Sequence, residues 1–343
     1  MFFEAKQRPV RWTDRTLSVL RASRLESCEK ELAGLSGSGL FDPETTDLEA
    51  ERLFERSWMA SEEREPRLHT IEELRTRVLS DFPAEFMLLS PEEYELAVKL
   101  AMTGGRLVLS DWNDLIPARS LIRRLWCRPD PGRKNGLLMP RSLCLGVVLM
   151  LAAEETRGIR ETVDAVVDMV DNTLYLAGMM PAETAQKDLE WRLQGTSAAD
   201  RPHLARRLLL ATFETLVDRE GRLMLAHPGL ADPYSFLKRP GGLSLGADQE
   251  EMEDLYASLM DVEDPFYERM LELVQDVARP EAGAEDTVED LMLLAKQGAP
   301  VSQMREVLAS RIICLPTEEM LSALADIHDR VPKWFSLNMT RVQ

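Results

Sequence analysis

The chain has 343 residues, of which 45% are hydrophobic and 29% charged, and its formal net charge is −18. This length is enough for about two domains of ~150 residues and for a large core. The negative charge argues against a protein whose whole surface binds nucleic acid or anionic lipid.

In the N-terminal third, helix-capping residues predict successive helices. Thr13 fits the N-cap of a first helix, and a second is predicted over about 42–61. Thr70 with Glu73 three residues later forms a capping box for a third helix. Ser90, followed by a proline and two glutamates, predicts a fourth that stops at a pair of glycines. Residues 106–110 could form a short strand, but one such segment cannot make a sheet.

The most apolar stretch of the chain lies between residues 140 and 180. Leu143–Ala153 contains only apolar residues and one glycine, and as a helix it would be about 16 Å long, too short to cross a bilayer. We therefore expect a helix buried on all sides. A break at Gly158 and a second amphipathic helix ending at Gly178 would complete a buried central hairpin. The expected apolar stripe of that second helix is Val163, Val166, Val167, Val170, Leu174 and Ala177.

The remaining patterns also predict helices, over about 182–194 and 198–220 and from starts near 248, 264, 286, 300 and 317. Prolines and glycines accumulate over 227–246, where we place a boundary. The expected fold is all-α: an irregular multi-helix bundle, with a helical-repeat-like C-terminal part as the alternative. The expected domains are 1–237, with the central hairpin at about 140–180, a Gly/Pro-rich connection at 238–246, and an acidic domain at 247–343.

Charge is distributed unevenly along the chain. Residues 119–141 contain seven basic residues and one acidic residue, whereas residues 248–290 contain sixteen acidic and two basic residues. Arginine side chains can bind carboxylate or phosphate through two hydrogen bonds. The basic segment therefore predicts a partner- or anion-binding surface, with pairing to the protein's own acidic residues as the alternative. Its candidate residues are Arg119, Arg123, Arg124, Arg128, Arg133, Lys134 and Arg141.

The sequence contains only incomplete motifs for a metal site or a catalytic nucleophile. Glu161, Asp164 and Asp168 are three and four residues apart, so on one helix they could hold Mg²⁺. Their spacing resembles that of helical nucleoside-triphosphate pyrophosphohydrolases, but segment 142–153 lacks the paired-glutamate motif of that family. The residues around Ser244 match the Gly-x-Ser-x-Gly string of a nucleophile elbow. The elbow also needs a strand before the serine, and no strand is predicted there. The main expectation is therefore no metal, no cofactor and no catalytic residue.

Four widely spaced cysteines occur without a Cys-x-x-Cys pair: Cys28, Cys127, Cys144 and Cys314. This favours unpaired thiols in a reducing compartment. The N-terminal residues lack the apolar core of a signal peptide, so the expectation is a soluble cytoplasmic protein with no membrane partner.

Together these patterns favour a non-enzymatic helical adaptor or regulator that binds a protein partner. Opposite charges in segments 119–141 and 248–290 would steer the association, and methionines of the C-terminal helices would supply adaptable apolar contacts. These are Met252, Met260, Met270 and Met292. One alternative is an all-α metal-dependent hydrolase acting on a nucleotide-type substrate. The other is a nucleic-acid-associated subunit that binds through its arginine-rich segment.

Overall fold

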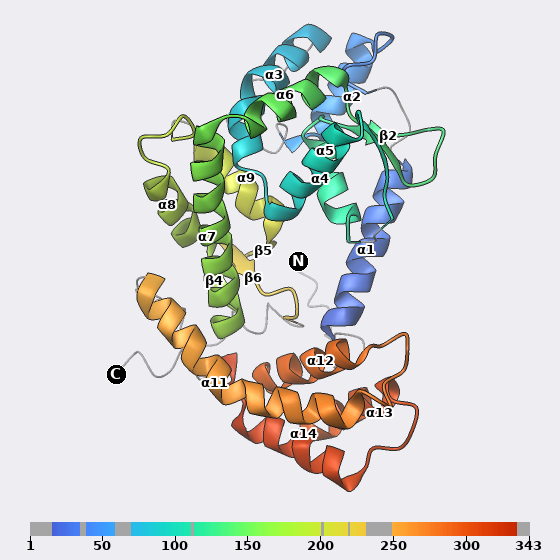
Figure 1. Cartoon of the computed structure of the whole chain (residues 1–343), viewed down its shortest axis with the longest axis vertical. Helices are drawn as coiled ribbons and strands as arrows, with labels where there is room; N and C mark the ends of the chain where they lie inside the picture. Colours follow the sequence, from blue (N-terminus) through green and yellow to red (C-terminus); the bar gives the residue numbers. More distant parts are fainter. Residues whose placement is uncertain are drawn as a thin grey trace, which may run out of the picture. The chain divides into compact units, whose positions relative to one another are not determined.

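The computed structural model describes residues 16–34, 39–58, 70–110, 113–199, 202–218, 220–230 and 249–334. Within these ranges the chain forms thirteen helices and two small three-stranded sheets (Figure 1). The all-α prediction is therefore confirmed. Thr13 and the predicted connection at 238–246 lie outside the described residues.

The chain divides into two compact units, each with its own buried tryptophan. The unit around Trp126, called here the Trp126 unit, comprises Arg24–Asp168 and Ala182–Thr212. The Trp334 unit comprises Met1–Ser23, Met169–Pro181 and Phe213–Gln343.

Most helices belong wholly to one unit. Those of the Trp126 unit are α2 (Asp47–Arg56), α3 (Ile71–Met87), α4 (Pro91–Met102), α5 (Leu115–Arg123), α6 (Arg141–Leu151), α8 (Ala182–Arg192) and α9 (Pro202–Thr212). Those of the Trp334 unit are α11 (Gln249–Val274), α12 (Ala284–Lys296), α13 (Val301–Arg311) and α14 (Glu318–Arg330). The remaining two, α1 (Leu17–Gly34) and α7 (Glu154–Ala177), contribute residues to both units.

Capping residues place several helix starts where the sequence predicts them. The predicted capping box of Thr70 with Glu73 is present on α3, and the predicted cap Ser90 forms a box with Glu93 on α4. The hydroxyl of Thr317 likewise accepts a hydrogen bond from a backbone N–H at the start of α14. Each cap satisfies N–H groups that have no partner within the helix, and this fixes where the helix begins.

Three predicted helix boundaries are wrong. Helix α2 starts at Asp47 rather than near 42, because Thr46 makes a capping box with Glu49. Helix α11 continues through Pro265, since its apolar side, including Met270, packs into a core that outweighs the lost hydrogen bond. Helix α12 starts at Ala284, after Gly283 at φ +68°, two residues before the predicted Asp286.

The prediction that residues 106–110 cannot form a sheet is wrong. Strand β1 (Arg106–Val108) pairs antiparallel with β3 (Gly136–Leu138), which also pairs with β2 (Arg128–Pro129). The sequence after α5 turns back on itself, with Asp130 accepting a hydrogen bond from the Gly132 N–H at 2.9 Å. A distant segment therefore supplies the partner strands that no local pattern indicates.

The predicted helix over 198–220 is interrupted. It ends with α9 at Thr212, and the chain enters β5 (Glu214–Val217), which forms a hairpin with β6 (Leu223–Ala226). The Asp218 carboxylate accepts the N–H groups of Glu220 and Arg222, each at 2.8 Å, and stabilises the turn. Strand β4 (Met179–Pro181) completes the sheet on the other side of β6.

The expectation that the apolar run forms a helix buried on all sides is wrong. On α6 only Leu143, Cys144 and Val147 are buried. Leu145, Val148 and Leu149 are 60%, 44% and 64% exposed. Helix α6 packs against α3 and α4 with one side only, and Gly146 allows the Phe82 ring to approach.

The predicted hairpin with the next helix is only partly correct. The break comes at residues 152–153, and α7 runs through Gly158. All six predicted stripe residues of α7 are buried, and Gly178 follows with φ +75°. However, α6 packs along α3 and α4 rather than along α7.

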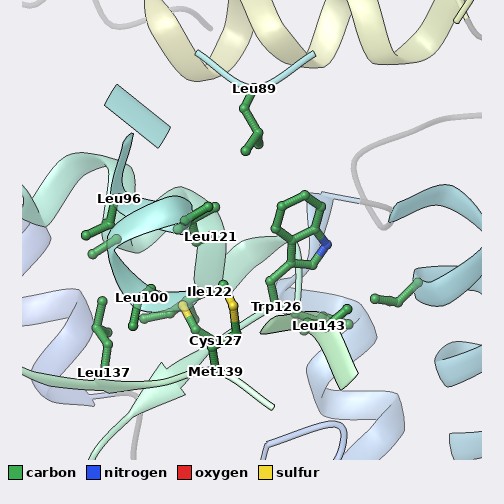
Figure 2. Close-up of a cluster of buried hydrophobic side chains, with 14 of the residues drawn as sticks. Leu89, Leu96, Leu100, Leu121, Ile122, Trp126, Cys127, Leu137, Met139 and Leu143 are labelled. Atoms are coloured by element: carbon green, nitrogen blue, oxygen red, sulfur yellow. The ribbon is translucent and has the colours of Figure 1, made fainter. Parts of the chain in front are cut away.

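Figure 2 shows the apolar core of the Trp126 unit. Side chains of α4, α5, β3 and α6, among them Leu96, Leu121, Leu137 and Leu143, belong to the same buried cluster as Trp126. The Trp334 unit has a core between α11, α12, α13 and α14, which pack together in Figure 1. Charged side chains are buried in both units, among them Arg124 and Glu93 in one and Lys296 and Glu263 in the other.

Candidate functional site

Four of the seven predicted basic residues interact within the Trp126 unit. Arg119 lies 3.4 Å from Glu31, and Arg128 lies 2.9 Å from Asp42. The Arg123 guanidinium lies 4.1 Å from the centre of the Trp58 ring. Arg124 is buried and pairs with two glutamates, as described below. These four side chains are thus engaged in interactions within the protein.

The other three predicted residues, Arg133, Lys134 and Arg141, are exposed. None of them forms an ion pair with any residue that the structure describes. Arg133 and Lys134 lie on the turn between β2 and β3, and Arg141 is the first residue of α6. Within the predicted basic segment, the positive charge available to a partner therefore lies at this turn and at the start of α6.

A small cavity of about 240 Å³ lies next to the start of α6. Its lining includes Asp42, Trp126, Cys127, Arg128 and Arg141. The ion pair between Arg128 and Asp42 neutralises most of the charge that Arg128 would offer to an anion. Burial raises the pKa of the Cys127 thiol, so that sulfur stays protonated and is a poor nucleophile. The cavity does not combine the groups that catalysis or strong anion binding would need.

The Trp126 unit contains a buried group of charged side chains. Arg124 lies 3.5 Å from Glu85 and 3.1 Å from Glu93, and all three side chains are buried. Arg207 of α9 forms a further ion pair with Glu85. Arg160 of α7 donates to the backbone carbonyls of Met87 and Leu89 at the end of α3. The ion pairs join α3, α4 and α9 to Arg124 at the end of α5, and Arg160 separately joins α7 to the end of α3.

The Trp334 unit contains a second buried polar cluster. The Nζ of Lys296 lies 2.5 Å from Glu263 Oε1, and the Tyr175 hydroxyl donates to Glu263 Oε2 at 2.7 Å. Nearby, His227 packs against Trp334 with a ring-centre distance of 5.3 Å. Burial and the positive charge of Lys296 lower the pKa of His227 from 6.5 to about 4. This imidazole is therefore neutral near pH 7.

The sequence patterns miss both clusters, although a signal is present. Glu263 lies between Leu259 and Met270 on the buried side of α11, and Glu93 shares a helix side with Leu96 and Leu100 on α4. A charged residue at such a position has to find a partner when the helix packs. Which partner it finds depends on contacts between distant segments, and helical periodicity does not encode those.

The candidate metal ligands do not converge. Glu161 and Asp168 are exposed, and Asp164 accepts a hydrogen bond from Arg160 at 2.6 Å. Among the described residues, no three or more His, Cys, Asp or Glu side chains form a group that could hold a metal ion.

Two of the methionines proposed for partner contacts are core residues instead. Met270 and Met292 are buried in the core of the Trp334 unit, so neither is available to a partner. Met260 is partly buried, and the side chain of Met252 lies outside the described residues. For Met270 and Met292 the interpretation as contact residues is wrong, because both side chains are buried where α11 and α12 pack together.

One side of α6 is an exposed apolar surface. Arg141, Leu145, Val148 and Leu149, called here the α6 face, are all exposed. At 100° per residue these four positions fall within an arc of about 100°. The α6 face therefore presents an apolar stripe with a cation at its N-terminal end.

Comparisons with protein-family models, curated proteins and solved structures find no match to this chain. In the described ranges, no helix combines the length and apolar character needed to cross a membrane.

Proposed function

We propose that this protein is a non-enzymatic helical adaptor or regulator that binds another protein chain through the α6 face. The observation that carries the proposal is the exposure of Leu145, Val148 and Leu149 side by side on one helix. Exposed apolar residues scattered singly are ordinary on protein surfaces, but these three form a continuous stripe.

Three exposed cations of the Trp126 unit are available to a partner: Arg141 at the start of α6, and Arg133 and Lys134 on the turn between β2 and β3. Arg133, Lys134 and Arg141 are exposed and make no ion pair within the described parts of the chain. Exposed charges of this kind mainly raise the association rate, whereas the buried apolar contacts determine how slowly the complex dissociates. The α6 face would therefore provide affinity, and the three cations would steer association.

Site-specific crosslinking in the natural host tests this function. A photo-reactive amino acid is placed at Leu149, and separately at Leu48, which is similarly exposed but lies on α2. We expect a protein adduct from position 149 and none from position 48. Equal adducts from both positions, or none from 149, would contradict binding through the α6 face.

Charge reversal tests the steering role. Arg133→Glu with Lys134→Glu should leave folding intact, because both side chains are exposed, and should slow association about tenfold or less. Reversing Arg124 is unsuitable, because its buried side chain holds two glutamates. An association rate that does not change in the double variant would rule out steering by this turn.

A further inference from the structure

Charges of opposite sign flank the apolar stripe of the α6 face. Arg141 lies at the N-terminal end of the apolar stripe, and Glu154 lies just beyond its C-terminal end as the first residue of α7. Both are exposed, and neither forms an ion pair with a described residue. An apolar centre with opposite charges at its two ends is self-complementary when two copies meet antiparallel.

We propose that the chain that binds the α6 face is a second copy of this protein, with the two α6 helices packed antiparallel about a two-fold axis. This inference rests on the proposed function and names its partner. In the sequence, the exposed residues Leu145, Val148 and Leu149 lie between positions 141 and 154, so the apolar residues separate the two charges. Arg141 of each copy then lies next to Glu154 of the other, so the ion pair forms twice.

The charges favour a second copy over an acidic partner. A partner bearing only carboxylates would satisfy Arg141 but would repel Glu154 at the other end of the stripe. An antiparallel copy satisfies both groups and also places the N-terminal end of one α6 beside the C-terminal end of the other, where helix dipoles attract. Since one helix of eleven residues offers less area than a standard interface, the dimer should be weak and concentration-dependent.

Analytical ultracentrifugation of the purified full chain over a series of concentrations tests the arrangement. We expect a reversible monomer–dimer equilibrium that the double substitution Leu145→Ser with Leu149→Ser abolishes. Arg141→Glu and Glu154→Arg should each raise the dimer Kd about tenfold, because each places like charges opposite one another twice. The two changes together should return the Kd to within about threefold of the original value. Lys187→Glu on α8, an exposed position away from α6, is the control and should leave the Kd unchanged.

The outcomes separate this inference from the proposed function. A chain that stays monomeric at every concentration would overturn the second-copy inference, while a crosslink from position 149 to a different protein in the host would still support the proposed function. A dimer in which the charge swap does not restore affinity would overturn the antiparallel arrangement. A dimer unaffected by any α6 change would overturn the inference, and the absence of a crosslink at 149 would then remove the proposed function as well.

Discussion

The Nζ of Lys296 lies 2.5 Å from Oε1 of Glu263, and both side chains are withdrawn from water. Burial lowers the pKa of Lys296, and the carboxylate of Glu263 opposes that shift. The Tyr175 ring lies beneath the ammonium at 4.1 Å and its hydroxyl donates to the same carboxylate, so the charged pair is enclosed by one connected set of contacts.

Replacing Glu263 with Gln should destabilise the protein by about 3–5 kcal/mol, because the ammonium of Lys296 would remain buried without a counter-ion. Chemical denaturation at pH 7 measures this loss. Glu268→Gln, at an exposed position of the same helix, is the matched control and should change stability by less than about 0.5 kcal/mol. Adding Lys296→Met to Glu263→Gln should recover much of the loss, and no recovery would show that the unpaired charge is not its cause.

The neighbouring arginines of α5 should differ sharply in their effect on stability. Arg124→Gln removes the partner of Glu85 and Glu93 inside the Trp126 unit and should cost about 3–5 kcal/mol. Arg123→Gln removes the contact with the Trp58 ring and the attraction of Glu31 for the charge, on a half-buried side chain, and should cost about 1 kcal/mol or less. Thermal melts of the two variants side by side provide the comparison. Similar losses would contradict the assignment of Arg124 to a structural network.

A matched pair on α6 tests the orientation of that helix. Val147→Asp would bury a carboxylate and should cost several kcal/mol, comparable with the whole stability of a typical domain. Leu149→Asp places the same group at a position that is 64% exposed, and it should cost about 1 kcal/mol or less. Denaturant midpoints report both values. If Leu149→Asp proved as damaging as Val147→Asp, the exposed stripe would in fact be core.

His227 should make stability depend on pH. Its pKa is lowered to about 4 in the folded protein, against 6.5 unfolded, so the unfolded chain takes up the proton first as the pH falls. The stability that comes from keeping this imidazole neutral is complete above pH 6.5 and is lost progressively as the pH falls towards 4, by about 3 kcal/mol in all.

The variant His227→Asn isolates this effect. Its side-chain oxygen can accept the Gly229 N–H that the His227 Nδ1 accepts at 3.1 Å, but it does not titrate. Unfolding free energies of both proteins at pH 7 and pH 5 should show a smaller decrease for the variant. Equal decreases would mean that other groups account for the acid sensitivity.

Local signals predicted the helices well where one physical cause dominates. The box of Ser90 with Glu93 determines the start of α4 because the caps satisfy backbone N–H groups within four residues. The buried stripe of α7, from Val163 to Ala177, follows from helical period alone. Where contacts are distant, the patterns were insufficient, as in the pairing of β1 with β3.

The apolar composition of α6 led to a wrong prediction of its burial. Nothing in Leu143–Ala153 distinguishes Val147, which is buried, from Leu149, which is exposed, because both are aliphatic. The difference arises from the positions of α3 and α4, which cover one side of α6 only. The candidate basic residues behaved similarly: adjacent Arg123 and Arg124 differ in burial because a helix turns by about 100° per residue.

The four cysteines differ in their accessibility to thiol reagents. Cys28, Cys127 and Cys144 are buried, and burial raises the pKa of both Cys127 and Cys144, whereas Cys314 is exposed between α13 and α14. Maleimide reagents require an accessible thiolate, so under native conditions they will modify Cys314 alone. A single fluorophore or spin label can thus be attached to the Trp334 unit without mutagenesis, and its tumbling rate would report the size of the particle that carries it.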